Sequence, residues 1–363
     1  MIFIKRSRST SLGLFIVLNI LFCIPQLRAQ ELELLPEILE TKSDFDSTYI
    51  QSYKYKLTAR LYASQKYTSF YIPANDGSKH LTFIPNNTFN TGVGVTYRTI
   101  TLNLGFGLPG INGNSSNRGK TNSLDCQMHS YGRKGIFDVY FQFYKGYYLN
   151  QGSIPDYSGF FSNSQLRAQL LGGSYTHIHN NRKFTLRPGA VQDEKQLRSA
   201  GSLLYGFEFL YSKLQNDSDA FVTLGLTDYS NYLHVRNLKA FNLGPTFGYG
   251  YNFIFLKDFF LSAAVQITAA ASHNTTKIVE DAGNHNLSKW SFSPHATGRA
   301  SIGYMKDNWS VSVYFVNQTT TSKDGFNNYY AMNTGNFRVN LVKRFTPGKK
   351  VSRILKPVDK VFK

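Results

Sequence analysis

The sequence predicts an all-β protein: a transmembrane antiparallel up-and-down β-barrel of about 14 strands, or about 12 if the weakest strands are dropped. Three observations predict this fold. From residue 53 onward, apolar and polar residues alternate with a period of two. Aromatic residues make up 15% of the chain, with 29 Phe and 24 Tyr. Short turns alternate with long polar loops, an asymmetry typical of outer-membrane barrels, whose turns face the periplasm.

The composition excludes several other classes of protein. The 363 residues include 42% hydrophobic residues and only two cysteines, and their net charge is +18. The chain is therefore too apolar for disorder and too poor in cysteine for a disulfide scaffold. No apolar run approaches the roughly 20 residues that a membrane-spanning helix needs. Nucleic acid is not an expected partner despite the charge, because an exported barrel does not meet it.

The chain divides into four segments. Residues 1–29 are expected to be a signal peptide, because basic residues precede an apolar run at 12–24 and Ala29 offers a small residue for cleavage. An acidic periplasmic segment follows at 30–46, then the β-barrel at 47–346 and a basic periplasmic tail at 347–363. The tail either attracts the acidic segment or anionic lipid headgroups, or both ends are disordered, and the sequence leaves these alternatives open.

Residues 241–255 show the alternation over the greatest length, with Phe, Tyr and Leu in one row and Gly, Thr and Asn in the other. A strand of that length, at about 3.3 Å per residue and about 40° tilt, exceeds an apolar band of about 25 Å. A soluble barrel would show the same pattern with the apolar row inside. About 14 strands, however, enclose a lumen too wide for one layer of side chains to fill. We therefore expect the rings to face lipid, and we expect a bulge or bend at Gly244-Pro245, where proline lacks an N–H.

The connections are assigned from clusters of turn residues and polar residues. We expect short turns near 98–99, 131–135, 180–181, 256–258 and 306–308. We expect long outer loops at 65–80, 109–120, 150–163, 192–199, 227–237, 273–288 and 320–329, with a weak strand at 221–226.

Three short runs carry a resemblance: residues 244–252 (GPTFGYGYN), Gln196 with the run 199–202, and residues 180–182 with Phe184. They resemble the domain of unknown function 4421 family. The likeness extends from about Asp46 to beyond residue 300. The resemblance implies an exported, barrel-like protein of Gram-negative envelopes. It supplies no catalytic residues, because the family has no assigned activity.

The candidate lumen residues are charged side chains assigned to the inward row of the predicted strands. They are Lys54, Lys56, Arg60, Asp125, Asp138, Arg167, Glu208, Arg299 and Arg338. One interpretation is a positive field that favours small anionic solutes, and the other is a set of paired charges that plugs the barrel. The sequence leaves both open.

No catalytic, cofactor or metal site is predicted. The run 113–121 resembles a phosphate-binding loop, but it has one residue too many between its glycines and a strand follows it. His177 and His179 point the same way on one strand, without a visible third metal ligand. The outer loops contain His273 and His285, which keep a lipase- or protease-type barrel enzyme as the alternative.

We therefore expect a non-catalytic outer-membrane barrel that acts as a pore, a plugged scaffold or a surface interaction protein. Its expected partners are outer-membrane lipids and lipopolysaccharide, and the barrel-assembly machinery. The last strand ends at Phe345, and an aromatic end of this kind resembles the signal by which barrels are assembled. No cofactor is expected.

Overall fold

The structure is a computed structural model of the chain, and it describes residues 45–86, 89–98, 100–107, 118–150, 161–216, 227–280, 283–349, 351–353 and 355. The expected signal peptide, most of the acidic segment and of the basic tail, and the weak strand at 221–226 lie outside the described residues. Within the described ranges, no helix is long and apolar enough to cross a membrane.

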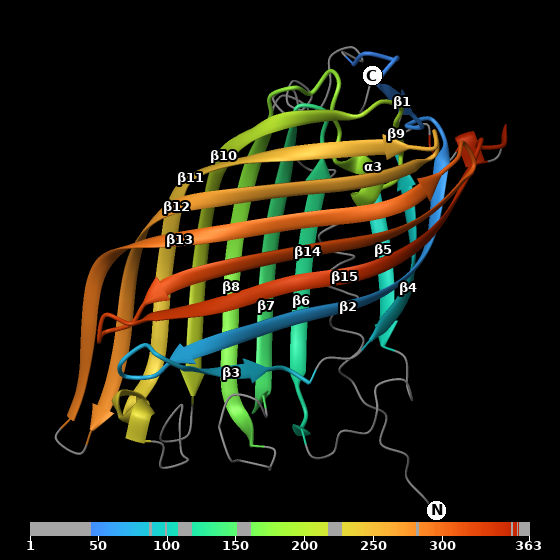
Figure 1. Cartoon of the computed structure of the whole chain (residues 1–363). Helices are drawn as coiled ribbons and strands as arrows, with labels where there is room; N and C mark the ends of the chain where they lie inside the picture. The colour runs from blue at the N-terminus through green and yellow to red at the C-terminus, as the bar shows by residue number, and fades with distance from the viewer. Residues whose placement is uncertain are drawn as a thin grey trace, which may run out of the picture. The chain divides into compact units, whose positions relative to one another are not determined.

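Ten antiparallel strands form a closed ring, and three more strands attach to it (Figure 1). In ring order they are β2 (Leu57–Pro73), β3 (His80–Ile84), β7 (Gly135–Leu149), β8 (Ser162–Ile178), β10 (Ala200–Asn216), β11 (Val235–Phe255), β12 (Phe259–Glu280), β13 (Gly283–Met305), β14 (Trp309–Lys323) and β15 (Tyr329–Phe345). Pairing of β15 with β2 completes the ring.

The three attached strands lie beside the first half of the ring. The strand β4 (Asn90–Tyr97) pairs with β2, β5 (Ile100–Gly107) pairs with β4, and β6 (Asn122–Tyr131) pairs with β7. A separate two-stranded sheet joins β1 (Ile50–Ser52) to β9 (Glu194–Gln196). The all-β antiparallel barrel is confirmed, whereas the expected count of about 14 or 12 strands is not.

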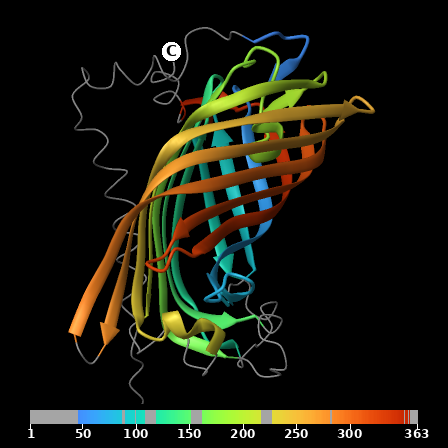
Figure 2. The same ribbon diagram turned by 60° about the vertical axis from the view of Figure 1, so that its left-hand side comes forward.

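Two segments expected as loops are strands. Residues 65–73 continue β2, and β12 and β13 stay paired without interruption out to Glu280 and Gly283. This hairpin extends past its neighbours at its tip (Figure 2). Residues 283–288 are exposed on both faces. Because both faces meet the same surroundings there, no apolar row marks the strand in the sequence.

Over much of the wall, the apolar rows face outward and the polar rows face inward. On two paired strands, Phe247 and Val265 are 62% and 59% exposed. Their neighbours Thr246 and Gln266 are 6% and 3% exposed. The predicted orientation of the rings is therefore confirmed, and the soluble alternative, with apolar residues inside, does not describe this barrel.

The two ends of the barrel differ in their connections, and we call them the turn end and the loop end. The turn end contains the short connections at 98–99, 132–134, 256–258 and 306–308, together with the start of β2 and the end of β15. At the loop end lie η4 (Thr227–Tyr232) and the turn 324–328. Leu256 and Lys257 both have positive φ, 49° and 66°, the geometry of a tight hairpin that usually selects Asn or Gly.

An apolar cluster occupies the interior of the loop end. Phe70 stacks on Phe83 with ring centroids 4.9 Å apart, and Tyr147 meets Phe70 edge-on at 5.0 Å. Tyr229 and Tyr232 of η4 are buried in the same cluster. We call this set of residues the loop-end cluster; its other members include Leu166, Ala168, Leu170, Leu210, Leu214, Tyr330 and Met332.

The expected bulge at Gly244-Pro245 is not present in the register. Gly244 and Pro245 pair with β10, and their partners on β12 are missing, but the register on either side is unchanged. The only shift between β11 and β12 lies at Val235/Asn237. Pro245, which lacks an N–H, is thus left out of the pairing between β11 and β12, and neither strand contains an extra residue there. A Cβ on Gly244 would lie 2.2 Å from the Ala269 carbonyl oxygen, so the glycine allows a close approach of β12.

Candidate functional site

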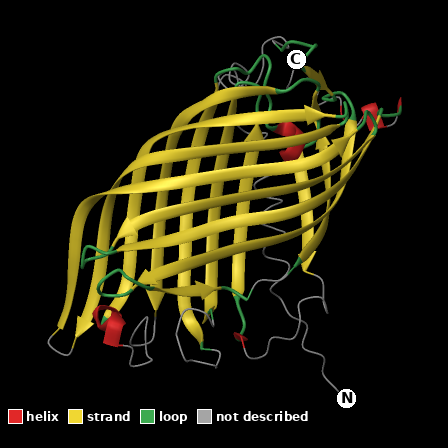
Figure 3. Ribbon diagram, in the orientation of Figure 1, coloured by secondary structure: helices red, strands yellow, loops and turns green. Residues whose placement is uncertain are grey.

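The plug segment, residues 179–199, connects β8 to β10 and fills the turn end. It contains α3 (Arg187–Ala190), which lies on the inner side of the strands (Figure 3). Phe184 is fully buried against Gly250, where an added Cβ would lie 2.8 Å from the ring. A Cβ on Gly189 would lie 2.1 Å from the Ser301 hydroxyl oxygen. These contacts with inward residues of β11 and β13 place the plug segment inside the barrel.

Two buried ion pairs fix the plug segment: one lies within it, and the other joins it to the turn between β6 and β7. The Arg187 guanidinium donates to both carboxylate oxygens of Asp193. Arg133, in the turn between β6 and β7, donates to Glu194 at 2.7 Å and to the Phe184 carbonyl oxygen at 2.6 Å. Burial lowers the pKa of Arg133, and the charge of Glu194 opposes that shift. Because both arginines and both carboxylates are paired, the plug contains buried charge at a tolerable desolvation cost.

Arginines of the barrel wall bind the backbone of the plug. Arg344 donates to the Gln192 carbonyl oxygen at 2.7 and 2.9 Å, and Arg60 donates to the Val191 carbonyl oxygen. Gln192 has a φ of 59°, a left-handed conformation that is unfavourable for a residue other than glycine. Its side chain donates to Ser312, so contacts on three strands maintain this strained backbone.

A polar cavity of about 70 Å³ lies in the lumen. Seven strands contribute to it, and most of its lining side chains can form hydrogen bonds. They are Gln127, His129, Asp138, Tyr140, Gln142, Ser174, Glu208, Thr297, Arg299, Val316, Gln318, Thr334, Gly335 and Asn336.

Each carboxylate of the cavity pairs with a histidine. Asp138 Oδ1 lies 2.6 Å from His129 Nδ1, and Glu208 Oε1 lies 2.7 Å from His295 Nδ1. Arg299 donates to Asp138 Oδ2 at 2.9 Å. A carboxylate–imidazole pair is the base half of a nucleophilic site. Ser174 lines the cavity, but within the described residues its hydroxyl forms no hydrogen bond to either imidazole, so the nucleophile–base contact is not made.

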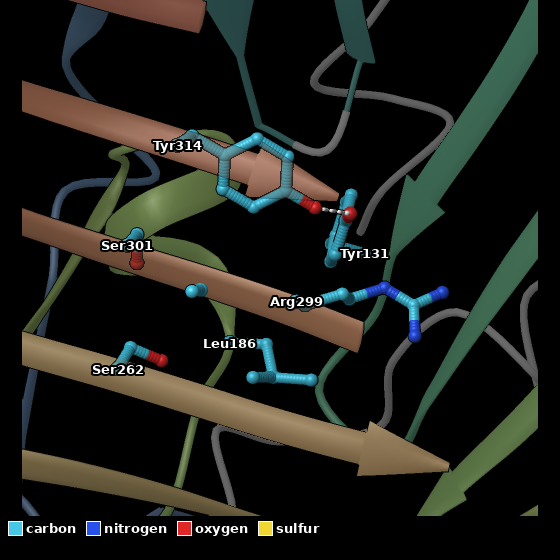
Figure 4. Close-up of a pocket in the computed structure, with 7 residues that line it drawn as sticks. Tyr131, Leu186, Ser262, Arg299, Ser301 and Tyr314 are labelled. Carbon is cyan, nitrogen blue, oxygen red and sulfur yellow. Dashed lines mark hydrogen bonds between the residues drawn. The ribbon is translucent and has the colours of Figure 1, made fainter. Parts of the chain in front are cut away.

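Arg299 also lines a smaller pocket of about 10 Å³ on the side of the plug segment (Figure 4). Tyr131 and Tyr314 bring their hydroxyls within 3.2 Å of each other there, and Leu186 of the plug segment forms another wall. The plug segment therefore closes the turn-end side of Arg299.

Most of the sequence-predicted lumen charges point inward. Arg60 reaches the plug segment, and Asp138, Glu208 and Arg299 line the cavity. The other two are Asp125, which lies 3.2 Å from Lys66 and accepts a hydrogen bond from Tyr144 at 2.8 Å, and Arg338, whose guanidinium lies 4.7 Å from the centre of the Tyr62 ring.

The prediction of a lumen position is wrong for three residues. Arg167 lies in the row of Leu171, which faces outward. On this part of β8 the inward row is the apolar one, Leu166, Ala168 and Leu170, because it packs in the loop-end cluster. Lys54 and Lys56 precede β2 and lie at the turn end, where Lys56 Nζ donates to Asn308 at 3.1 Å.

The segment 192–199 was expected as an outer loop, and this expectation is also wrong. It belongs to the plug segment at the turn end. Its polar residues suggested solvent, whereas arginines and backbone groups inside the barrel satisfy them.

Sequence reasoning missed His129 and His295 as lumen residues. Both lie in rows whose other members were assigned to the lumen: His129 is four residues from Asp125, and His295 is four from Arg299. Because the strand period is two, even spacing from an inward charge was a signal that could have identified them.

The other histidines singled out in the sequence lie apart from the cavity. His177 is near Tyr205, with ring centroids 4.9 Å apart, and His179 lies beside it on the outward row. His273 and His285 lie on β12 and β13, in the hairpin that projects at the loop end. Most of the run 113–121 lies outside the described residues, and the described part of the chain contains no group of three or more potential metal ligands.

Solved structures of outer-membrane proteins are similar to this chain at low sequence identity. No curated protein matches it. It is similar to the outer membrane protease OmpT from Escherichia coli, at 10% identity and TM-score 0.36, covering 81% of this chain and 98% of that chain. It is also similar to the P. putida toluene transporter TodX, at 8% identity and TM-score 0.29, covering 81% and 91%. A Pseudomonas aeruginosa FadL homologue matches at 9% identity and TM-score 0.20, covering 79% and 90%. Likenesses this distant carry no argument about chemistry.

The family comparison is specific. The model of a domain of unknown function, DUF4421, matches residues 44–345, a range that contains every described strand. The chain therefore belongs to the DUF4421 family.

Proposed function

We propose that this protein is a non-catalytic outer-membrane β-barrel with a closed lumen, which acts as a scaffold and not as an open pore. The observation that carries the proposal is closure at both ends. The plug segment fills the turn end, and the loop-end cluster fills the other.

The outward apolar belt supports the membrane location. Exposed rings and aliphatic side chains encircle the barrel, among them Leu61, Leu104, Phe141, Phe207, Phe247, Val265 and Val311. Burying apolar surface gains about 25 cal/mol per Å², and a patch of this extent on a soluble protein would aggregate. Polar residues inside and apolar residues outside are the arrangement that a bilayer stabilises.

The pairing of the lumen charges supports the plugged interpretation over an anion pore. Asp138 contacts both His129 and Arg299, and Glu208 contacts His295. An anion-selective pore needs positive charge exposed to passing ions, whereas the Arg299 guanidinium is paired with the Asp138 carboxylate.

Planar-bilayer recording of the purified, folded protein tests this proposal, with an open porin reconstituted in parallel as the positive control. We expect the porin to show steps and this protein to show none. Steady single-channel steps from this protein would overturn the closed lumen. Recovery from the soluble periplasmic fraction, without heat-modifiable mobility, would overturn the membrane location.

The non-catalytic part of the proposal is tested separately. Lipase and protease assays are run on the wild-type protein and on the variants His273→Ala and His285→Ala. We expect no activity above the detergent blank. Activity that either substitution abolishes would favour the enzyme alternative.

A further inference from the structure

Among the described residues, the wall of the barrel has a seam between β5 and β6 that no strand fills. All ladder partners of β5 lie on β4, and all those of β6 lie on β7. The backbone edges that β5 and β6 present to each other therefore have no partner strand among the described residues. We define the seam as the facing edges of Ile100–Gly107 and Asn122–Tyr131.

The seam is a window and not a complete split in the barrel. At the loop end β3 bridges β2 and β7, through the pairs Phe83↔Leu149 and Ile84↔Tyr148. Lys66 of β2 contacts Asp125 of β6 directly, at 3.2 Å. The opening is thus bounded toward the loop end by a strand and an ion pair, and it lies between the β4–β5 pair and β6.

Apolar side chains flank the seam on its outer surface. Leu104 and Phe106 of β5 are each 64% exposed, and Met128 of β6 is 61% exposed. The seam therefore lies at the level of the apolar belt. Unpaired backbone groups in hydrocarbon cost several kcal/mol each, so these edges need water, protein or a bound molecule beside them.

The polar cavity borders β6, the strand that forms one side of the seam. Gln127 and His129, on the inner face of β6, form part of its lining. The His129 side chain is 42% exposed, whereas its partner Asp138 is 8% exposed. One side of the cavity is therefore formed by the strand whose outer edge is open.

Two buried amide oxygens in the cavity lack a hydrogen-bond partner among the described residues. They belong to Gln142 and Asn336, which are 2% and 7% exposed. Unsatisfied buried acceptors are costly, and a ligand that donates hydrogen bonds would satisfy them. The buried Arg299 Nε–H in the lining also lacks a partner among the described residues, whereas Asp138 and Glu208 already have partners. The cavity therefore favours an uncharged group that both donates and accepts, such as a hydroxyl group.

The volume of the cavity limits the ligand to a small headgroup. About 70 Å³ holds about five waters, or a group the size of glycerol. It does not hold an acyl chain, which would have to leave through the seam into the apolar belt.

We propose that the seam and the polar cavity together bind an amphiphile from the bilayer, with an uncharged, hydroxyl-bearing head in the cavity and its acyl chain passing between β5 and β6. This inference rests on the membrane location proposed above, but it does not depend on the absence of conductance. His129, Gln142 and Asn336 would contact the head, and the outward side chains of β5 and β6 would contact the chain.

Photocrosslinking of the full chain in nanodiscs tests the inference. The probe is a monoacylglycerol with a diazirine in its acyl chain. We expect mass spectrometry to locate adducts on β5 and β6, including Met128, and we expect unlabelled monoacylglycerol to compete. Adducts distributed evenly around the belt, for example on Phe247 and Val265, without competition, would overturn the inference. Absence of adducts from β5 and β6 would do so as well, because water or a polypeptide would then cover the edges.

Two variants separate binding from folding. Gln142→Leu removes polar groups from the cavity and should reduce competable labelling at least tenfold. Asn274→Leu is the matched control, because Asn274 is an equally buried inward amide of β12 outside the cavity. Its labelling should stay at the wild-type level, with heat-modifiable mobility reporting the folding of both variants. Equal labelling of both folded variants would overturn the role of the cavity.

The inference can still be tested if Gln142→Leu does not fold, because the adduct map and the competition experiment use the wild-type protein. An ionised fatty acid is the second competitor. Stronger competition by the fatty acid than by monoacylglycerol would overturn the assignment of an uncharged head. Specific seam labelling of a protein that also conducts ions would support this inference and overturn only the closed lumen.

Discussion

The wall from β11 to β14 and the wall from β4 to β6 have the same alternation of residues but very different pairing. The strands β12 and β13 are paired continuously from Phe259↔Tyr304 to Glu280↔Gly283. The strands β4 and β5 pair only from Asn90↔Gly107 to Tyr97↔Ile100, and β5 and β6 each have one edge without a partner strand in the described part of the chain. The period of two thus determines which face of a strand is apolar, whereas strand length and neighbours determine whether the wall is continuous.

The Asp138–Arg299 pair crosses the lumen from β13, in the well-paired wall, to β7, the strand that pairs with β6. Asp138→Leu should lower the free energy of unfolding by about 3–5 kcal/mol, because it leaves the Arg299 charge buried without its carboxylate. Urea unfolding in detergent measures the change. Asp125→Leu is the control, because its partner Lys66 is 26% exposed and no buried charge is left behind. It should cost less, about 1–3 kcal/mol, mainly because the buried Tyr144 hydroxyl loses this acceptor. Equal losses in the two variants would contradict a special role for the inner pair.

Gly189→Ala tests the packing of α3 on β13, in the well-paired wall. The new Cβ would meet Ser301, and the overpacking should cost about 1–3 kcal/mol. The same unfolding assay applies. Gly298→Ala on β13, whose Cβ would meet nothing within 4 Å, should be near neutral, and Ser301→Gly should partly rescue Gly189→Ala. If the two alanine variants are equally stable, the plug segment does not pack as described.

Hydrogen exchange measures the difference in pairing between the two walls. Amides on the open edges of β5 and β6 should exchange at least about tenfold faster than amides in the middle of β12, because local opening is easier where ladder bonds are missing. Mass spectrometry of peptides from protein in nanodiscs measures both rates together. Equal protection would mean that the two edges are paired in the bilayer.

The smallest expected effect is a pH dependence at the loop end, outside the two walls. Burial raises the pKa of Asp324, although Tyr232 and the N–H groups of Phe326 and Asn328 donate to its carboxylate and oppose the shift. A raised pKa contributes stability at pH below about 4, and this contribution is lost as pH rises through the folded value. From pH 4 to 7, the Tm of the wild type should therefore fall relative to that of Asp324→Asn.

An exposed aspartate is the control for that measurement. The backbone N–H and the hydroxyl of Ser78 lower the pKa of Asp76, so its contribution is present above its unfolded pKa and is lost as pH falls. Asp76→Asn should show a difference of the opposite sign. The same sign in both variants would contradict the effect of burial on Asp324.

The barrel class and the outward rings were predictable from the sequence, because a lipid-facing row and a polar row differ at every second residue. Arg299 and Glu208 were predictable as inward residues for the same reason. Arg167 was not, because inward residues of β8 become apolar where they meet the loop-end cluster. The plug segment was not predictable either: the partners of Arg187 and Gln192 come from distant strands, and the polar composition of the segment is equally typical of a solvated loop.

Because β3 bridges β2 and β7, a very short strand pairing lies within the ring, between β3 and β7. Between β15 and β2, the first and last strands of the ring, pairing runs from Phe345↔Leu57 to Ala331↔Tyr71. Between β3 and β7 it consists of Phe83↔Leu149 and Ile84↔Tyr148 alone. A force that opens the ring is therefore expected to separate β3 from β7 before it separates β15 from β2. The barrel can then widen between β3 and β7 while β15 and β2 stay paired.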